Sequence, residues 1–249
     1  MCWSVSMAQI TLAHSESLTV ALPNEGYAPY IIIEQEQVSG ILVEPLQLAA
    51  SNIGLDLHYV YYPEQRSKLM LENKQIDARM ESEQWVDNPE DYLWSEAITV
   101  LEDVLVFNTH SELRFERETD LIGGSIIAHL GYSYPTLQPL IEQNLLQRVD
   151  FASSYEMLSH LYRPLAGVNR AAVMNRYVAM WLIHSTPKFE GQFALSKQPI
   201  ASAPLQFQFA NNPRLAAIVS KLNQQLRQLK SANRIQQLTD TILKTAISP

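Results

Sequence analysis

The sequence predicts an α/β protein built of two lobes, each a largely parallel sheet with helices on its faces. The chain has 249 residues, 47% of them hydrophobic, which is enough for two lobes of ordinary size. Strand-like and helix-like segments alternate along it, as in sheets whose parallel strands are connected by helices. A polar stretch at 108–120 separates two such series, and we expect the first hinge there.

The first series begins with a short β-rich run and a turn. Leu18–Leu22 stops at Pro23-Asn24-Glu25-Gly26, which is typical of a turn after a strand. Val43–Ile53 carries apolar residues at helical spacing, and Gly54 follows as a stop signal. The other elements expected here are an extended excursion at Tyr30–Glu34 and Gln37–Gly40, a strand at Leu55–Tyr61, a helix at Pro63–Glu72, and strands at Ile76–Met80 and Val100–Phe107.

The second series repeats this alternation. Ser125–His129 reads as a strand and Gly131-Tyr132-Ser133-Tyr134 as a turn. Pro135 stands at the preferred first position of a helix that should run to about Leu146, so its N-terminus is expected to face that turn. The other elements expected are a strand at Arg148–Phe151, a helix at Ser153–Leu161, a strand at Ala171–Met174, a helix at Arg176–Ile183 and a strand at Gln192–Lys197.

The end of the chain is expected to return to the first lobe. After a strand at Leu205–Phe209, two amphipathic helices at about Pro213–Leu229 and Asn233–Ala246 need an apolar face to cover, and the first lobe has one. The predicted organisation is a leader at 1–17, lobe 1 at 18–107 and 202–249, and lobe 2 at 108–201.

The segment Met1–Ser17 is interpreted as a leader or a truncated signal sequence. It is mildly apolar and ends in Ala13-His14-Ser15, a spacing seen before signal-peptidase cuts, but it has no basic start. Cys2 is the single cysteine, so no internal disulfide is expected. The longest apolar runs, such as Ala171–Ile183, fall short of the roughly 20 apolar residues that a membrane span requires.

Charge and motif content narrow the classes of function. The formal net charge is −8 and the basic residues are scattered, so nucleic acid is not an expected partner. The six histidines show no metal-type spacing, and neither a metal nor a cofactor is expected. The sequence has no nucleophile elbow, phosphate-binding loop or dinucleotide fingerprint. The sequence therefore favours a binding protein over an enzyme.

Five blocks in order along the chain carry a resemblance to a known family. They are Asn24–Tyr30, Gly40–Glu44, Leu71–Asp77, Asn88–Glu90 with Trp94–Glu96, and Leu121–Ile127 with Gly131–Tyr134. Together they resemble the family-3 extracellular solute-binding proteins, the amino-acid-type substrate-binding proteins of ABC transporters. The resemblance implies a two-lobed periplasmic-binding-protein-like fold with a central cleft and two hinge crossings. It also implies a periplasmic protein, expected to be a monomer, that brings a small polar ligand to a membrane permease.

Two other functions stay open on the same resemblance. The chain could be the ligand-sensing protein of a signalling system, with a sensor kinase as partner. Some relatives are dehydratases that act on cyclic acids, so an enzyme on the same fold is the third alternative. Fold alone does not choose among them.

Two departures from the family pattern bear on the ligand. Asp91 stands where amino-acid-binding members carry an arginine for the α-carboxylate. Asn175 stands where they carry an acidic residue for the α-ammonium. Both charges of a free α-amino acid therefore lose their usual partner, and the standard amino-acid clamp is not expected.

The first lobe is expected to build its side of the site around Arg79. This residue lies at a strand end, where a guanidinium can receive a carboxylate or phosphate. Glu81 is a candidate acceptor for an ammonium group, and Trp85 a candidate stacking surface for a ring or cation. Tyr27 and Tyr30 offer flat, amphipathic surface beside the cleft. Ordinary packing and salt bridging remain the alternative interpretation of each of these side chains.

The second lobe is expected to contribute backbone and amide groups. Gly131, Tyr132 and Ser133, with Tyr134, should present backbone N–H groups and a helix N-terminus to an anion. Asn175 completes the predicted site, with Arg176 beside it as a further source of charge. We therefore expect a small polar ligand whose anionic group bridges the lobes.

Overall fold

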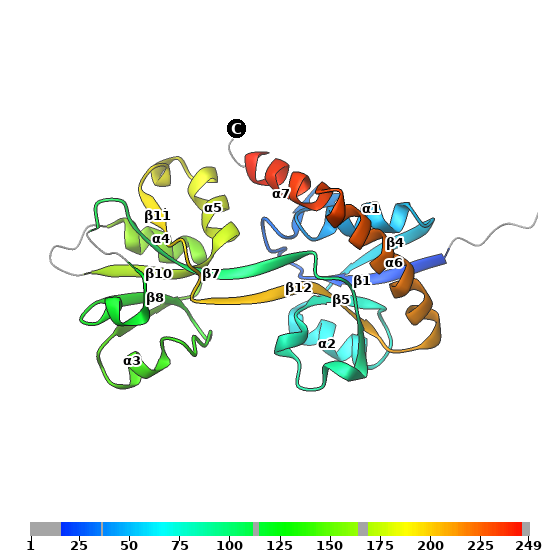
Figure 1. The fold of residues 1–249 in the computed structure, drawn as a ribbon, viewed down its shortest axis with the longest axis horizontal. Coiled ribbons are helices and arrows are strands. Elements are labelled where there is room, and N and C mark those ends of the chain that lie inside the picture. The colour runs from blue at the N-terminus through cyan, green and yellow to red at the C-terminus, as the bar shows by residue number, and fades with distance from the viewer. Residues whose placement is uncertain (1–15, 36, 112–114, 164–168, 246–249) are drawn as a thin grey trace, which may run out of the picture.

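Two lobes lie side by side in the computed structural model, which describes residues 16–35, 37–111, 115–163 and 169–245 (Figure 1). The long strands β7 (Thr99–Asn108) and β12 (Ala201–Ala210) run between them. One ten-stranded sheet continues through both lobes in the order β4-β1-β5-β12-β7-β10-β8-β9, with β6 on β12 and β11 on β7. The two-lobed α/β fold predicted from the sequence is confirmed.

The first lobe combines parallel strands with the returning strand β12. β1 (Glu16–Leu22) pairs in parallel with β4 (Leu55–Tyr61) and with β5 (Ala78–Glu81), and β12 pairs antiparallel with β5. Apolar residues at alternating positions of β1 are fully buried because they face the core. The other elements are β2 (Ile32–Glu34), β3 (Gln37–Ser39), β6 (Tyr92–Trp94), α1 (Val43–Ser51), α2 (Glu64–Glu72), α6 (Pro213–Ser231) and α7 (Arg234–Thr245).

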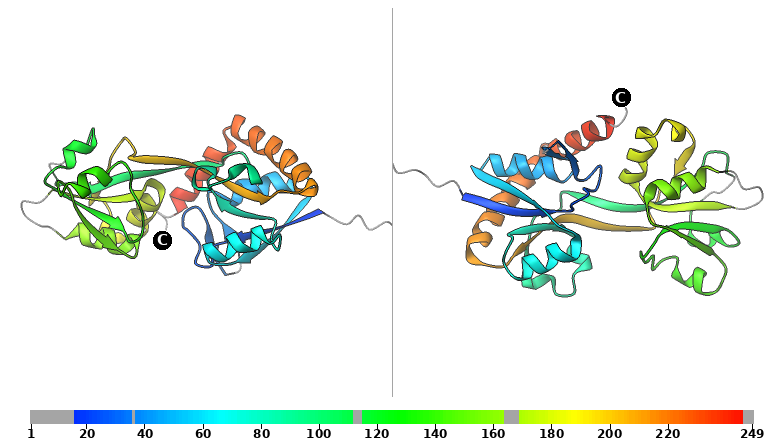
Figure 2. Two further views of the ribbon diagram at one scale, coloured as in Figure 1. Left: turned by 90° about the horizontal axis from the view of Figure 1, so that it is seen from below. Right: turned by 180° about the vertical axis from the view of Figure 1, so that it is seen from behind.

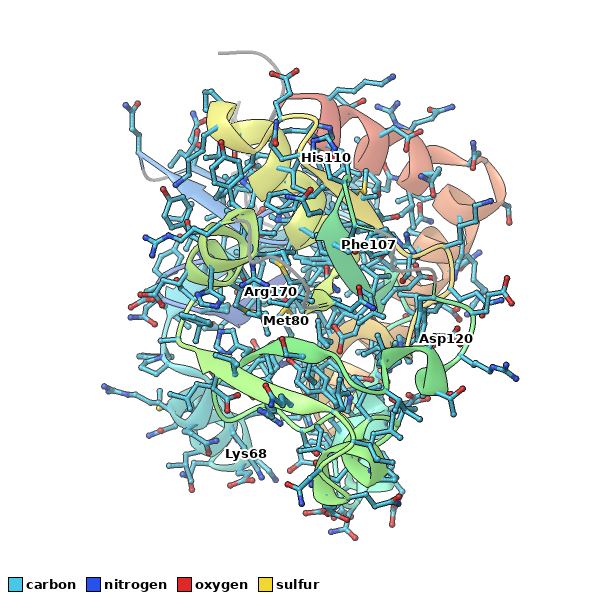
Figure 3. All side chains as sticks on the ribbon, turned by 90° about the vertical axis from the view of Figure 1, so that its left-hand side faces the viewer. Lys68, Met80, Phe107, His110, Asp120 and Arg170 are labelled. Atoms are coloured by element: carbon cyan, nitrogen blue, oxygen red, sulfur yellow. The ribbon has the colours of Figure 1, made fainter. Side chains whose placement is uncertain are left out.

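The second lobe has two cores, one on each face of its sheet. β8 (Ser125–His129) pairs in parallel with β9 (Gln147–Phe151) and β10 (Arg170–Asn175), while β10 and β11 (Phe193–Leu195) pair antiparallel with β7. Residues of α4 (Ser154–Tyr162) and α5 (Arg176–Ser185) fill one core, and the segment of α3 (Gln138–Glu142) covers the other. Figure 3 views the molecule end-on, with Arg170 near the middle and Asp120 toward the edge.

The chain changes lobes inside β7 and β12. The segment Thr99–Asp103 of β7 pairs with Ala201–Leu205 of β12. From Val104 onward β7 pairs with β10 and packs in the second lobe, so the predicted boundary after Phe107 lies beyond the crossing. One uninterrupted apolar strand serves both lobes, and for that reason the sequence pattern shows no break at the crossing.

The two closing helices pack on the first lobe. Both belong to its core and contact α1, and α7 also contacts α5 of the second lobe (Figure 2). The predicted leader lies outside the described residues apart from Glu16 and Ser17, which begin β1. Within the described ranges, no helix combines the length and the apolar character that a membrane crossing needs.

The helix predicted from Pro135 to Leu146 is much shorter in the structure. It spans only Gln138–Glu142 because Pro139 lacks an N–H group and is tolerated only in the first turn of a helix. Asn144 then adopts a φ of 57°, which is incompatible with a continuing helix. A turn closed by the N–H groups of Leu137 and Gln138 on the Tyr134 oxygen leads from Tyr134 into this short helix, and the role of its N-terminus in binding an anion stays a prediction.

Candidate functional site

The two lobes approach each other at what we call the interlobe junction. It comprises the loop 23–31 after β1, the carboxyl ends of β8 and β10, and the crossing segment of β7 between them. Ligands of open α/β sheets bind outside the carboxyl ends of the strands, so this is the first place to search for a site. The Tyr30 hydroxyl donates a hydrogen bond of 2.8 Å to Asn175 Oδ1 and joins the two lobes directly.

The loop after β1 is a firm support for two tyrosine rings. Its backbone is closed by hydrogen bonds from the Tyr27 N–H to the Ile31 oxygen and from the Tyr30 N–H to the Tyr27 oxygen, both 2.8 Å. Gly40 has a φ of 120°, and a Cβ there would lie 2.4 Å from the Tyr30 oxygen, so only glycine fits. The rings of Tyr27 and Tyr30 stack with their centroids 5.2 Å apart.

Asn175 holds the second lobe's side of the junction. Its Oδ1 caps α5 by accepting the backbone N–H groups of Tyr177 and Val178, at 3.1 and 3.2 Å, in addition to the Tyr30 hydroxyl. Its Nδ2 is buried and has no acceptor among the described residues. A buried donor without an acceptor is costly, and a ligand oxygen would relieve that cost.

The turn Gly131–Tyr134 is placed at the junction, but with different chemistry from that predicted. Tyr132 and Ser133 are exposed and Tyr134 is buried, with its hydroxyl accepting the His129 N–H at 3.3 Å. Arg148 donates to the carbonyl oxygens of His129 and Tyr132 and lies 5.5 Å from the centre of the Tyr134 ring. The turn is thus held through its carbonyl groups by an arginine that also pairs with Asp150.

Arg79 is not the open anion receptor that the sequence suggested. It is buried in the first lobe, donates from Nε to Gln208 Oε1 at 2.8 Å and forms an ion pair with Glu81. The second carboxylate oxygen of Glu81 accepts the Ser82 N–H at 2.9 Å. Both predicted residues therefore satisfy each other, and the guanidinium charge is already neutralised.

Trp85 and Asp91, the other first-lobe residues considered from the sequence, lie on the exposed surface. Trp85 is 58% exposed in the 3₁₀ turn Glu83–Trp85, and its stacking role stays a prediction. Asp91 is also exposed, at the end of the turn Pro89–Asp91. The Ser82 hydroxyl, just past β5, is fully buried and has no partner among the described residues. Ser82 was not singled out from the sequence.

Asp103 is the functional candidate that sequence reasoning missed. It lies in the crossing segment of β7, opposite Asn175 of β10 and Ala201 of β12. Burial raises the pKa of its carboxyl group above the usual range for aspartate. The signal in the sequence was the pair Glu102-Asp103, which interrupts an otherwise apolar strand.

Arg176 and Glu102 belong to the opposite face of the same strand. They form an ion pair, and Arg176 also donates to the carbonyl oxygens of Ser196 and Lys197. Both line a cavity of about 260 Å³ whose other walls include Tyr30, Tyr177, Ile235 and Thr239. Because neighbouring strand residues point to opposite faces, this cavity lies away from the Asp103 side chain.

Metal binding finds no support in the described part of the chain. No group of three or more His, Cys, Asp or Glu side chains there is arranged to hold a metal ion. The polar groups of the junction are instead single hydroxyl, amide and carboxylate groups, which suit an organic ligand.

Comparison with known proteins identifies the fold. No protein-family model matches the chain, and no curated protein matches it in sequence. The structure resembles the L-cystine solute receptor of Neisseria gonorrhoeae in its unliganded open conformation, with a TM-score of 0.72, 15% identity, and 95% of this chain and 96% of that chain covered.

Two further solved structures are similar to the same extent. Substrate-binding domain 2 of GlnP from Lactococcus lactis, in an open conformation, gives a TM-score of 0.70 at 19% identity, covering 93% of this chain and 97% of that chain. An ancestral cationic amino acid solute-binding protein gives 0.71 at 14% identity, covering 91% and 95%. At these identities the likeness establishes the two-lobed periplasmic-binding-protein fold.

Proposed function

We propose that this chain is an extracytoplasmic solute-binding protein that captures a small polar molecule between its lobes and delivers it to the membrane permease of an ABC transporter. The observation that carries the proposal is the interlobe junction. There, the Tyr30 hydroxyl of the first lobe donates to Asn175 at the end of β10 in the second, and the ring of Tyr27 stacks on that of Tyr30.

The connection between the lobes supports a binding role. The chain passes between them in the paired strands β7 and β12, an arrangement that can bend without breaking either core. Solved structures with this fold include proteins described as solute receptors and transporter substrate-binding domains. Partially unsatisfied groups at the junction, the Asn175 amide above all, are what a ligand would complete.

Ligand-linked stabilisation tests this function. A molecule that binds only the folded chain, at a hundredfold excess over its dissociation constant, should add about 2.7 kcal/mol to the free energy of unfolding. We expect a thermal-shift screen of amines, carboxylates, sugars, nucleosides and short peptides to give at least one clear increase in Tm. A screen without any increase would count against binding.

A matched pair of variants places the binding event at the junction. Asn175→Ala removes the amide and should abolish the ligand-induced shift, at the cost of a helix cap worth about 1 kcal/mol. Lys68→Ala changes an exposed side chain of α2, labelled at the periphery in Figure 3, and should leave the shift unchanged. Equal shifts in both variants would place binding elsewhere.

A further inference from the structure

Asp103 lies in the crossing segment of β7, at the position where β7 pairs with both β12 and β10. Residues directly opposite each other in an antiparallel pair have their side chains on the same face of the sheet. The pairing of Asp103 with Asn175 on one side and with Ala201 on the other therefore puts its side chain on the same face of the sheet as those two side chains. Ala201 is small and exposed.

The carboxylate of Asp103 lacks a partner of its own. In the described ranges, no arginine, lysine or histidine forms an ion pair with it, and no side chain or backbone N–H donates to it. Asp103 is partly buried, and this burial raises the pKa of its carboxyl group, as expected for a carboxylate that has lost water without gaining a donor. A partly buried charge of this kind costs free energy unless a ligand pairs with it.

The arginines around the junction are not available to fill that role. Arg79 is paired with Glu81, Arg148 with Asp150 and Arg176 with Glu102. Burial raises the pKa of the Tyr132 hydroxyl, and the negative charge of Glu64, at the start of α2 in the other lobe, raises it further. The uncompensated charge of the junction is therefore negative, which reverses the expectation of an anionic ligand built around Arg79.

Tyrosines from both lobes lie within electrostatic reach of this charge. Burial raises the pKa of the Tyr27, Tyr30, Tyr132 and Tyr134 hydroxyls, and the negative charge of Asp103 adds a smaller contribution to each. Faces of aromatic rings attract cations, and hydroxyl oxygens accept N–H hydrogen bonds. Tyr30 and Tyr134 are buried, whereas Tyr27 is partly exposed and Tyr132 is 57% exposed, so the rings that can contact an organic cation are those of Tyr27 and Tyr132.

We propose that the ligand carries a cationic group, an ammonium, guanidinium or quaternary amine, which pairs with Asp103 between Tyr27 of the first lobe and Tyr132 of the second. The buried Nδ2 donor of Asn175, the residue opposite Asp103 on β10, favours a ligand that also has an oxygen acceptor. The inference rests on the proposed solute-binding function and specifies the ligand class of the same site.

The experiment compares cations with neutral molecules of the same shape. The probes are choline and its carbon isostere dimethylbutanol, putrescine and butanediol, a wider set of guanidines and amines, and succinate and inorganic phosphate as anions. We expect only cationic probes to raise the Tm of the wild-type chain. For the best of them, calorimetry on Asp103→Asn should show affinity falling by about thirtyfold or more, since a desolvated charge pair is lost.

A neighbouring variant on the same strand serves as the control. Glu102→Gln also removes one negative charge, but on the opposite face, where Glu102 pairs with Arg176. It should retain the affinity for the cation. A loss of affinity equal to that of Asp103→Asn would mean that net charge, and not the Asp103 site, attracts the ligand, and would overturn the proposal.

The possible results separate this inference from the function on which it rests. A neutral or anionic probe that stabilises the wild type and Asp103→Asn equally would overturn the proposal of a cationic ligand. It would leave the proposed solute-binding function standing. If no probe of any charge shifts the wild type, both proposals fail together. Circular dichroism of Asp103→Asn should match that of the wild type, and Asp103→Glu should recover part of the affinity if the carboxylate itself is what binds.

Discussion

Two acidic sites of this molecule, one at Glu81 and one at Asp103, differ in what their surroundings provide. Glu81 is buried but completely satisfied, because Arg79 pairs with it and the Ser82 N–H donates to its other oxygen. Asp103 is less buried, yet no described group pairs with it. The difference teaches that burial alone does not mark a binding residue: the satisfied pair at Glu81 has no group left for a ligand, whereas the unsatisfied carboxylate at the junction is where we propose that one binds.

The largest expected effect comes from breaking the satisfied site. Arg79→Met leaves Glu81 buried without its partner and should lower the free energy of unfolding by about 3–5 kcal/mol, measured by urea denaturation. The double variant Arg79→Met with Glu81→Leu should recover most of that loss because no charge is left unpaired. If Arg79→Met instead kept its stability and lost its ligand, Arg79 would be a binding residue and the contrast between the two sites would disappear.

A smaller effect is expected from the contact that bridges the lobes. Tyr30→Phe removes the hydroxyl that donates to Asn175, while two backbone N–H groups still satisfy the same oxygen. The loss should be about 0.5–1.5 kcal/mol, and small-angle scattering should show a modest increase in the radius of gyration. Tyr132→Phe is the control, because its ring is 57% exposed, and neither quantity should change.

The smallest effect is the pH dependence that Asp103 imposes. Its pKa is raised in the folded chain, so the folded state binds more protons than the unfolded state between the ordinary pKa of aspartate and the raised one. The unliganded protein should therefore lose stability as pH rises through that window and regain it as pH falls. Affinity for a cation should change in the opposite direction, since the cation needs the ionised carboxylate.

The difference between wild type and Asp103→Asn isolates this dependence from other titrating groups. Profiles of Tm against pH should diverge only in the acidic window above the ordinary aspartate pKa. Parallel profiles throughout would show that Asp103 is not perturbed. The other titratable and charged groups toward the junction are common to both chains; they are Tyr27, Tyr30, Tyr132, Tyr134, His129, Glu64, Arg148 with Asp150, and Glu102 with Arg176.

The sequence was sufficient to predict the architecture. Hydrophobic alternation and turn signals located strands such as β1 and β8, and the amphipathic pattern from Pro213 marked the start of α6. The short α3 was missed because Pro139 is compatible with a helix only near its start, and the pattern does not say where that start lies. The lobe crossing was missed because β7 continues through it.

The site was predicted only in part. Tyr27, Tyr30 and Asn175 meet at the junction because they follow strand ends, a position that sequence order reveals. Arg79 looked free in the sequence because neither of its partners is evident there. Glu81 is two residues away on the same strand, and Gln208 lies on β12, more than a hundred residues away, where only the register of β5 against β12 brings it to Arg79. Asp103 was overlooked because an acidic residue inside an apolar strand reads as an exposed edge position until the strand is known to join two lobes.

The position of Asp103 in the crossing segment of β7 has a consequence for the kinetics of binding. A carboxylate carried by the strands that both lobes share keeps its place whether the lobes stand apart or together, while Tyr27 and Tyr132 are carried by different lobes. We therefore expect binding in two steps. In the first, which depends on ligand concentration and on salt, the cation meets the charge of Asp103. In the second, which is unimolecular, the lobes close and bring the aromatic rings against the ligand. Stopped-flow tyrosine fluorescence would resolve the two as separate relaxations, with the slower rate reaching a plateau at high ligand concentration.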